Sequence, residues 1–180
     1  MTKRFGAEHP ETLNSMANIS LSYKQLWKFE AATKLAKEVL AMGTGNDVTT
    51  LTLRANLAVA LFEKKIFDKA EALGEQVLDE RRKILGGNHP DTLIFLSILA
   101  MVYNSQGKWE KAGNLMVETI EKQRSRLGEH HPSTLISKFN LSLIRLEQGQ
   151  WEMAEDVWVN ILAKVEAVLG REHECTVRCR

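Results

Sequence analysis

The stretch Leu85-Gly86-Gly87-Asn88-His89-Pro90-Asp91-Thr92-Leu93 decides the fold, because the same order of residue types recurs along the chain. An apolar residue, Gly, two further residues, His-Pro, one residue and Thr-Leu also begin at Phe5 and at Leu127. Thr50 and Thr176 mark two partial copies, so that successive threonines are 38, 42, 42 and 42 residues apart. A fixed period in this range indicates stacked structural repeats.

A second marker confirms the register of the repeats. An aromatic residue comes sixteen residues after Leu13, Leu51, Leu93 and Leu135, and an alanine follows three residues later. The aromatic positions are Phe29, Phe67, Trp109 and Trp151. These positions are structural, and we expect Trp109 and Trp151 to be core residues.

Each repeat is predicted to be a helical hairpin. The first helix opens at Pro10, Pro90 or Pro132, because proline suits the first position of a helix, where its missing N–H would be unpaired in any case. It ends near Gln106-Gly107 and Gln148-Gly149, where glycine supplies a left-handed conformation. The second helix begins at the aromatic residue and ends at Leu-Gly. One domain over residues 1–180 is predicted, with units at about 5–46, 47–84, 85–126 and 127–168 and a truncated fifth unit at 169–180.

The third unit carries a family resemblance. Its Tyr103, the turn Gln106-Gly107-Lys108-Trp109 and Ala112 resemble the tetratricopeptide repeat. The 42-residue period with Leu-Gly-x-x-His-Pro-x-Thr-Leu is similar to the kinesin-light-chain-like subclass, which also occurs in fungal NLR-type signalling NTPases. The resemblance covers nearly the whole chain and implies an all-α, right-handed α-solenoid. In one departure from the pattern, Arg145 replaces the tyrosine of the fourth unit.

The resemblance also implies a binding surface on the first helices, which line the concave groove of such arrays. An asparagine five residues after the Thr-Leu leucine hydrogen-bonds the backbone of an extended peptide in similar proteins, and an amide offers both a donor and an acceptor. The alternative is that asparagine packs at a seam between helices. The candidate groove residues are Asn14, Asn18, Asn56, Ile94, Ile98, Met101, Ile136 and Asn140. Since basic residues near this groove are few, namely Arg54, Lys138 and Arg145, we expect an apolar or mixed peptide.

Composition excludes several other classes of protein. Lys plus Arg is 24 and Asp plus Glu is 23, a balance that argues against a dedicated nucleic-acid binder. No apolar run is long enough to span a membrane. The two cysteines, Cys175 and Cys179, cannot form a disulfide framework, and with no signal-peptide pattern they predict a reducing, cytoplasmic compartment. Four of the five histidines hold repeat positions, too far apart to share a metal ion, so we expect no metal and no cofactor.

The predicted function is therefore a protein–protein interaction scaffold with a partner peptide or helix in the groove. We expect no enzyme, because nucleophile and phosphate-binding motifs are missing. The alternative is a ligand-sensing repeat segment of a larger NLR-like signalling NTPase. The identity of the partner and the oligomeric state stay open at this point.

Overall fold

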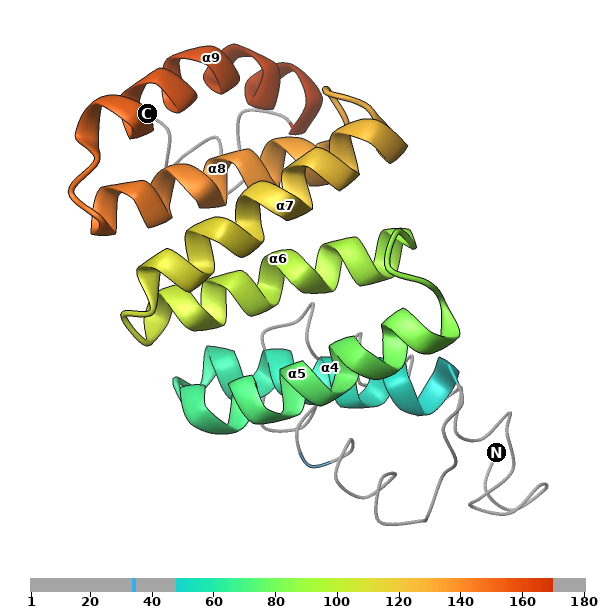
Figure 1. Ribbon diagram of the computed structural model, residues 1–180. Coiled ribbons are helices and arrows are strands. Elements are labelled where there is room, and N and C mark those ends of the chain that lie inside the picture. Colours follow the sequence, from blue (N-terminus) through green and yellow to red (C-terminus); the bar gives the residue numbers. More distant parts are fainter. Residues whose placement is uncertain (1–33, 35–47, 170–180) are drawn as a thin grey trace. The chain divides into compact units, whose positions relative to one another are not determined.

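The computed structural model describes Lys34 and residues 48–169, and in these residues the chain is helical with no strand (Figure 1). The helices are α4 (Val48–Glu63), α5 (Phe67–Ile84), α6 (Pro90–Ser105), α7 (Trp109–Leu127), α8 (Pro132–Glu147) and α9 (Trp151–Leu169). They form three consecutive pairs, and their starts at Phe67, Pro90, Trp109, Pro132 and Trp151 are the predicted ones. Apart from Lys34, the first predicted unit lies outside the described residues, and so do residues 170–180. The predictions for Pro10, Asn14, Asn18 and Phe29 fall in that unit.

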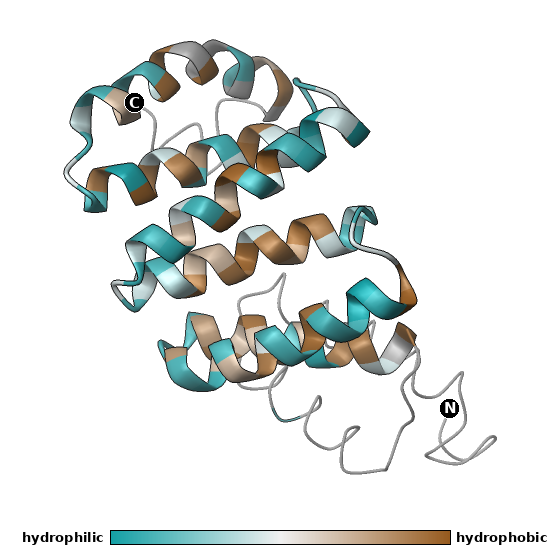
Figure 2. Ribbon diagram, in the orientation of Figure 1, coloured by the Kyte–Doolittle hydropathy of each residue, from teal (hydrophilic) through white to brown (hydrophobic). Residues whose placement is uncertain are grey.

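The chain divides into two compact units, Met1–Leu85 and Gly86–Arg180. In the first unit, α4 packs against α5. Helix α4 buries most of its length and α5 buries one face, which includes Ala70 and Val77. Figure 2 shows the difference, since α5 alternates between hydrophilic and hydrophobic residues while α4 is mostly hydrophobic.

In the second unit, each helix packs against the next one along the chain, and α6 also contacts α8. The first helix α6 contributes Leu93, Leu96 and Leu99 to the core, all at most 2% exposed. At the other end of the unit, Leu135, Phe139 and Ile161 form a buried cluster between α8 and α9.

Histidine caps both first helices of the second unit. The Nδ1 atom of His89 accepts a hydrogen bond from the backbone N–H of Asp91 at 3.2 Å, and His131 accepts one from Ser133 at the same distance. The following proline is the first helical residue in both helices. The His-Pro pair therefore satisfies a backbone donor that the start of a helix leaves unpaired.

Left-handed residues end the first helices, as predicted for Gly107 and Gly149, which both have φ of 74°. Lys65 holds the same place after α4 and has φ of 59°. A side chain disfavours this conformation, so the turn of the first unit uses a strained residue where the other two turns use glycine.

The prediction that the tryptophans are core residues is wrong. Trp109 is 42% exposed and Trp151 is 68% exposed, whereas Ala112 and Ala154, three residues further, are fully buried. Each tryptophan is the first residue of its helix and lies at the hairpin turn, where fewer neighbours surround a side chain. Phe67, at the same repeat position, is half-buried.

Candidate functional site

One face of α6 is left uncovered, although the helix is apolar almost throughout. Ile94 is 43% exposed, and Ile98 and Met101 are half-buried. All other residues from Thr92 to Tyr103 are buried. The spacing of four and then three residues places the three side chains on one stripe of the helix. The burial pattern thus gives α6 one free apolar stripe.

Helix α8 repeats this stripe 42 residues later. Ile136, Asn140 and Leu143 are its half-buried residues at the positions equivalent to Ile94, Ile98 and Met101. Ile136 and Leu143 also pack against the cluster between α8 and α9. Because α6 and α8 contact each other, the six residues belong to one surface, here named the first-helix face. The sequence prediction includes five of them and misses Leu143, although the 42-residue period points to it.

Two serines join the helices that carry this face. The hydroxyl groups of Ser97 in α6 and Ser137 in α8 are 2.7 Å apart and buried. Ser97 also donates weakly to the backbone oxygen of Leu93, at 3.4 Å. This contact was not predicted, because the serines are 40 residues apart and do not hold the same repeat position.

Asn56 lies in the first unit and is 8% exposed. Its Nδ2 group is buried and has no hydrogen-bond partner among the described residues. The seam alternative expects a neighbour to satisfy the amide, and the groove prediction expects the amide to face a partner. Asn140 differs from Asn56, because it is half-buried and lies on the first-helix face.

Two of the three basic residues expected near the groove form ion pairs, and the third, Arg145, lines a pocket. Arg54 pairs with Glu80 of α5, with 2.5 Å between Nη1 and Oε2, and also donates to Gln76. Lys138 pairs with Glu129, and this hydrogen bond holds the pKa of the Glu129 carboxyl below its usual range. Lys138 and Arg145 line a pocket among α7, α8 and α9, on the side of α8 opposite the first-helix face. Few basic residues are expected near the groove, and the six residues of the first-helix face include none. Asn140 is the polar residue among them.

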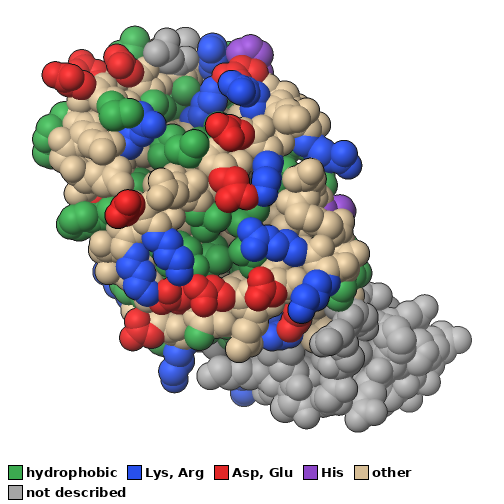
Figure 3. Space-filling view, viewed as in Figure 1, with side chains coloured by type: hydrophobic (Ala, Val, Ile, Leu, Met, Phe, Trp, Pro, Cys, Tyr) green, Lys and Arg blue, Asp and Glu red, His purple; other side chains and the backbone are tan. Residues whose placement is uncertain are grey.

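The surface charges of the second helices are mixed. Figure 3 shows Lys and Arg interspersed with Asp and Glu over the described part of the chain seen from this side. Within residues 48–169, no group of three or more His, Cys, Asp and Glu residues could hold a metal ion. None of the described helices is long and apolar enough to cross a membrane.

Comparisons with known proteins agree with the hairpin architecture. A family model described as tetratricopeptide repeat matches residues 49–112 and 92–158, and a second with the same description matches residues 12–44. No curated protein matches the sequence.

Solved structures give the same result. A Podospora anserina protein described as a kinesin light chain with nearly identical TPR-like repeats is 26% identical, with a TM-score of 0.75 over 96% of this chain and 83% of that one. BtubC (BKLC) from P. vanneervenii is 16% identical, with a TM-score of 0.74 over 90% of this chain and 66% of that one. The predicted fold class, an all-α solenoid of helical hairpins, and the predicted kinesin-light-chain-like type of repeat are confirmed.

Proposed function

The chain belongs to the tetratricopeptide repeat family, and from this premise we propose that it binds a partner peptide or helix on the first-helix face. Repeats of this family are in general non-catalytic scaffolds for protein interaction, and the likeness to kinesin-light-chain-like repeats supports that role here. The first-helix face is the part of the scaffold to which the proposal assigns the partner.

The single observation that carries the proposal is the exposure pattern of α6. Ile94, Ile98 and Met101 are exposed or half-buried on an otherwise buried apolar helix, at the spacing of one helix face. A helix that lays its own apolar stripe along such a surface removes apolar area from water on both partners.

Asn140 supplies the polar part of the proposed interaction. Its half-buried amide holds the position equivalent to Ile98, among the apolar residues of the face. An amide can donate to a peptide carbonyl and accept from a peptide N–H at the same time. We infer that Asn140 fixes the register of a partner whose apolar side chains contact α6.

The alternative, a ligand-sensing segment of a larger NLR-like signalling NTPase, is not favoured by the comparisons, which concern tetratricopeptide and kinesin-light-chain-like repeats. The proposal for this chain is a cytoplasmic scaffold with a protein or peptide partner, and neither a nucleic acid nor a membrane is part of it.

The test begins with an affinity pull-down on the full chain, followed by calorimetric titration of the partner that mass spectrometry identifies. Ile94→Asp places a charge on an exposed part of the face, so the fold should survive while the affinity falls at least about tenfold, because an apolar group of the partner would meet an unpaired charge. Asn140→Ala should weaken binding by about 5-fold to 100-fold if the peptide groups stay buried without a partner.

Val159→Asp is the matched control, because Val159 is 73% exposed on α9 and lies outside the first-helix face. Circular dichroism first establishes that each variant is folded. Wild-type affinity in both Ile94→Asp and Asn140→Ala would show that the partner binds another surface.

A further inference from the structure

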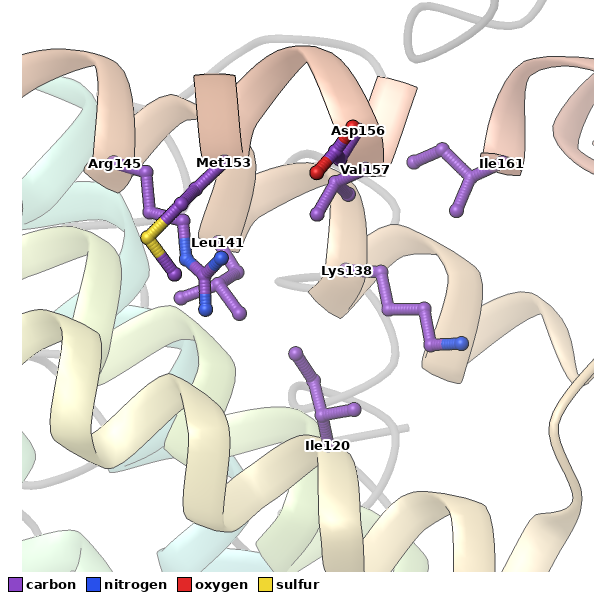
Figure 4. Close-up of a pocket in the computed structure, with 8 residues that line it drawn as sticks. All are labelled: Ile120, Lys138, Leu141, Arg145, Met153, Asp156, Val157 and Ile161. Carbon is purple, nitrogen blue, oxygen red and sulfur yellow. The ribbon is translucent and has the colours of Figure 1, made fainter. Parts of the chain in front are cut away.

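A pocket of about 320 Å³ lies among α7, α8 and α9 of the second unit (Figure 4). Its apolar wall consists of Ile120, Leu141, Met153, Val157 and Ile161. At about 100° per residue, the pocket-lining positions of α8 lie on the opposite side of that helix from the first-helix face. The volume falls at the lower end of the range that holds small-molecule ligands.

Three charged residues complete the lining, and two of them are already engaged. Lys138 is neutralised by Glu129, and its ammonium group points away from Arg145 in Figure 4. Asp156 also makes an interaction of its own. Within residues 48–169, Arg145 forms no ion pair and no side-chain hydrogen bond, and its guanidinium group lies beside Leu141. One unpaired cation therefore faces an apolar pocket.

The preceding hairpin places different residues at the same positions. Forty-two residues before Arg145 is Tyr103, which is 3% exposed, and Nζ of Lys111 lies 3.9 Å from the centroid of its ring. The counterpart of Lys111 in the last hairpin is Met153. The last hairpin thus exchanges a buried aromatic ring for a cation on the first helix, and it exchanges the lysine on the second helix for an apolar side chain.

We propose that this pocket binds a small amphipathic carboxylate, with its aliphatic or aromatic body against the apolar wall and its carboxylate paired with Arg145. The pairing is a charge-assisted hydrogen bond, for which the planar guanidinium group is suited because it can bind both carboxylate oxygens. The site is on another face from the one assigned to the protein partner, and it does not depend on that assignment.

The chemistry of the lining favours a small acid over a peptide strand. The lining residues include no side-chain amide and no hydroxyl group, so a peptide backbone in the pocket would find few hydrogen-bond partners there. An unpaired backbone N–H or C=O that leaves water is unfavourable. A carboxylate on an apolar body needs only the groups that the pocket provides.

The test uses two defined acids, 4-phenylbutyrate and octanoate, with the full chain. Calorimetry or chemical-shift titration should give saturable binding of at least one acid, with a dissociation constant on the order of 0.1–1 mM for ligands of this size. The matching neutral amide should bind at least about tenfold more weakly than the acid, because it cannot form the charged pair.

Two substitutions of Arg145 separate its charge from the space it leaves. Arg145→Gln should weaken the acid about tenfold and leave the amide unchanged. Arg145→Tyr restores the residue of the preceding hairpin, so the chain should fold, and the ring should fill the pocket and abolish binding of both ligands. Arg126→Gln, on the exposed end of α7 and outside this pocket, is the control and should keep wild-type affinity.

A second pair of variants tests the apolar wall. Met153→Glu adds a negative charge at a pocket residue that is 45% exposed, and it should weaken the acid about tenfold or more, whereas Val159→Glu on the same helix should not. The proposal is overturned if neither acid binds saturably up to about 10 mM, if acid and amide bind equally, or if Arg145→Gln retains full affinity.

Discussion

At the scale of single residues, exposure separates positions that the repeat pattern treats as alike. Phe139 is 2% exposed and belongs to the cluster between α8 and α9, so Phe139→Ala should cost about 3–5 kcal/mol of unfolding free energy. Trp109→Ala should cost about 2 kcal/mol and Trp151→Ala about 1 kcal/mol or less, because a larger part of each tryptophan already faces water. Urea unfolding followed by circular dichroism at 222 nm measures all three.

Ala154 provides the control on the same helix as Trp151. It is fully buried three residues further on, so Ala154→Leu should destabilise the protein by about 1–3 kcal/mol through overpacking, although it adds apolar area. A loss in Trp151→Ala as large as that in Phe139→Ala would contradict the exposure that the structure gives to Trp151.

The tryptophans also show what a sequence pattern leaves undetermined. Within residues 48–169, the aromatic residue 16 positions after the leucine correctly marks where α5, α7 and α9 begin. It does not say whether a neighbouring helix covers that position, since coverage depends on how hairpins pack. For the same reason Arg54 and Arg145 were placed near the groove, while the structure turns Arg54 towards Glu80 and Arg145 into a pocket.

At the scale of helices, the signals that determine their ends are local. His89 and His131 satisfy a backbone donor two residues away, and Gly107 and Gly149 take a conformation that few other residues adopt. Such features can be predicted from the sequence because they depend on a few adjacent residues. The contact between Ser97 and Ser137 depends on the register of α6 against α8, and no local signal encodes it.

The contact between Ser97 and Ser137 predicts unequal losses of stability for the two single substitutions. Ser97→Ala should cost about 1–3 kcal/mol, because Ser137 is 1% exposed and loses its partner. Ser137→Ala should cost less, about 1 kcal/mol, because Ser97 can still donate to the backbone oxygen of Leu93. Urea unfolding of both single variants and the double variant measures the coupling between α6 and α8.

The double variant distinguishes a hydrogen bond from simple packing. If the hydroxyl groups bond each other, the cost of the double variant should be smaller than the sum of the single costs. The double variant removes both hydroxyl groups, so it leaves no unpaired partner behind. Additive costs would mean that the two serines do not interact in solution.

At the scale of the whole molecule, contacts within the second unit link helices that follow each other in the chain. In addition, the first helices α6 and α8 contact each other. Repeat arrays built in this way have a stability that is roughly the sum of the repeats and their interfaces. The unit also has its own core, from Leu93 and Leu96 in α6 to Phe139 in α8 and Ile161 in α9. Its folding should therefore not depend on a distant part of the chain.

A fragment of residues 86–180 should accordingly fold as an independent helical unit. Removing the first unit leaves the described contacts among α6, α7, α8 and α9 unchanged, so the fragment should keep a helical spectrum and unfold cooperatively in urea. A shorter fragment, 86–145, ends inside α8 and lacks α9, so it loses Ile161 and one side of the cluster around Phe139. This control should show little cooperative unfolding, since its apolar surface has no covering helix. A gradual, non-cooperative transition in the fragment 86–180 would mean that the second unit requires residues 1–85 to fold.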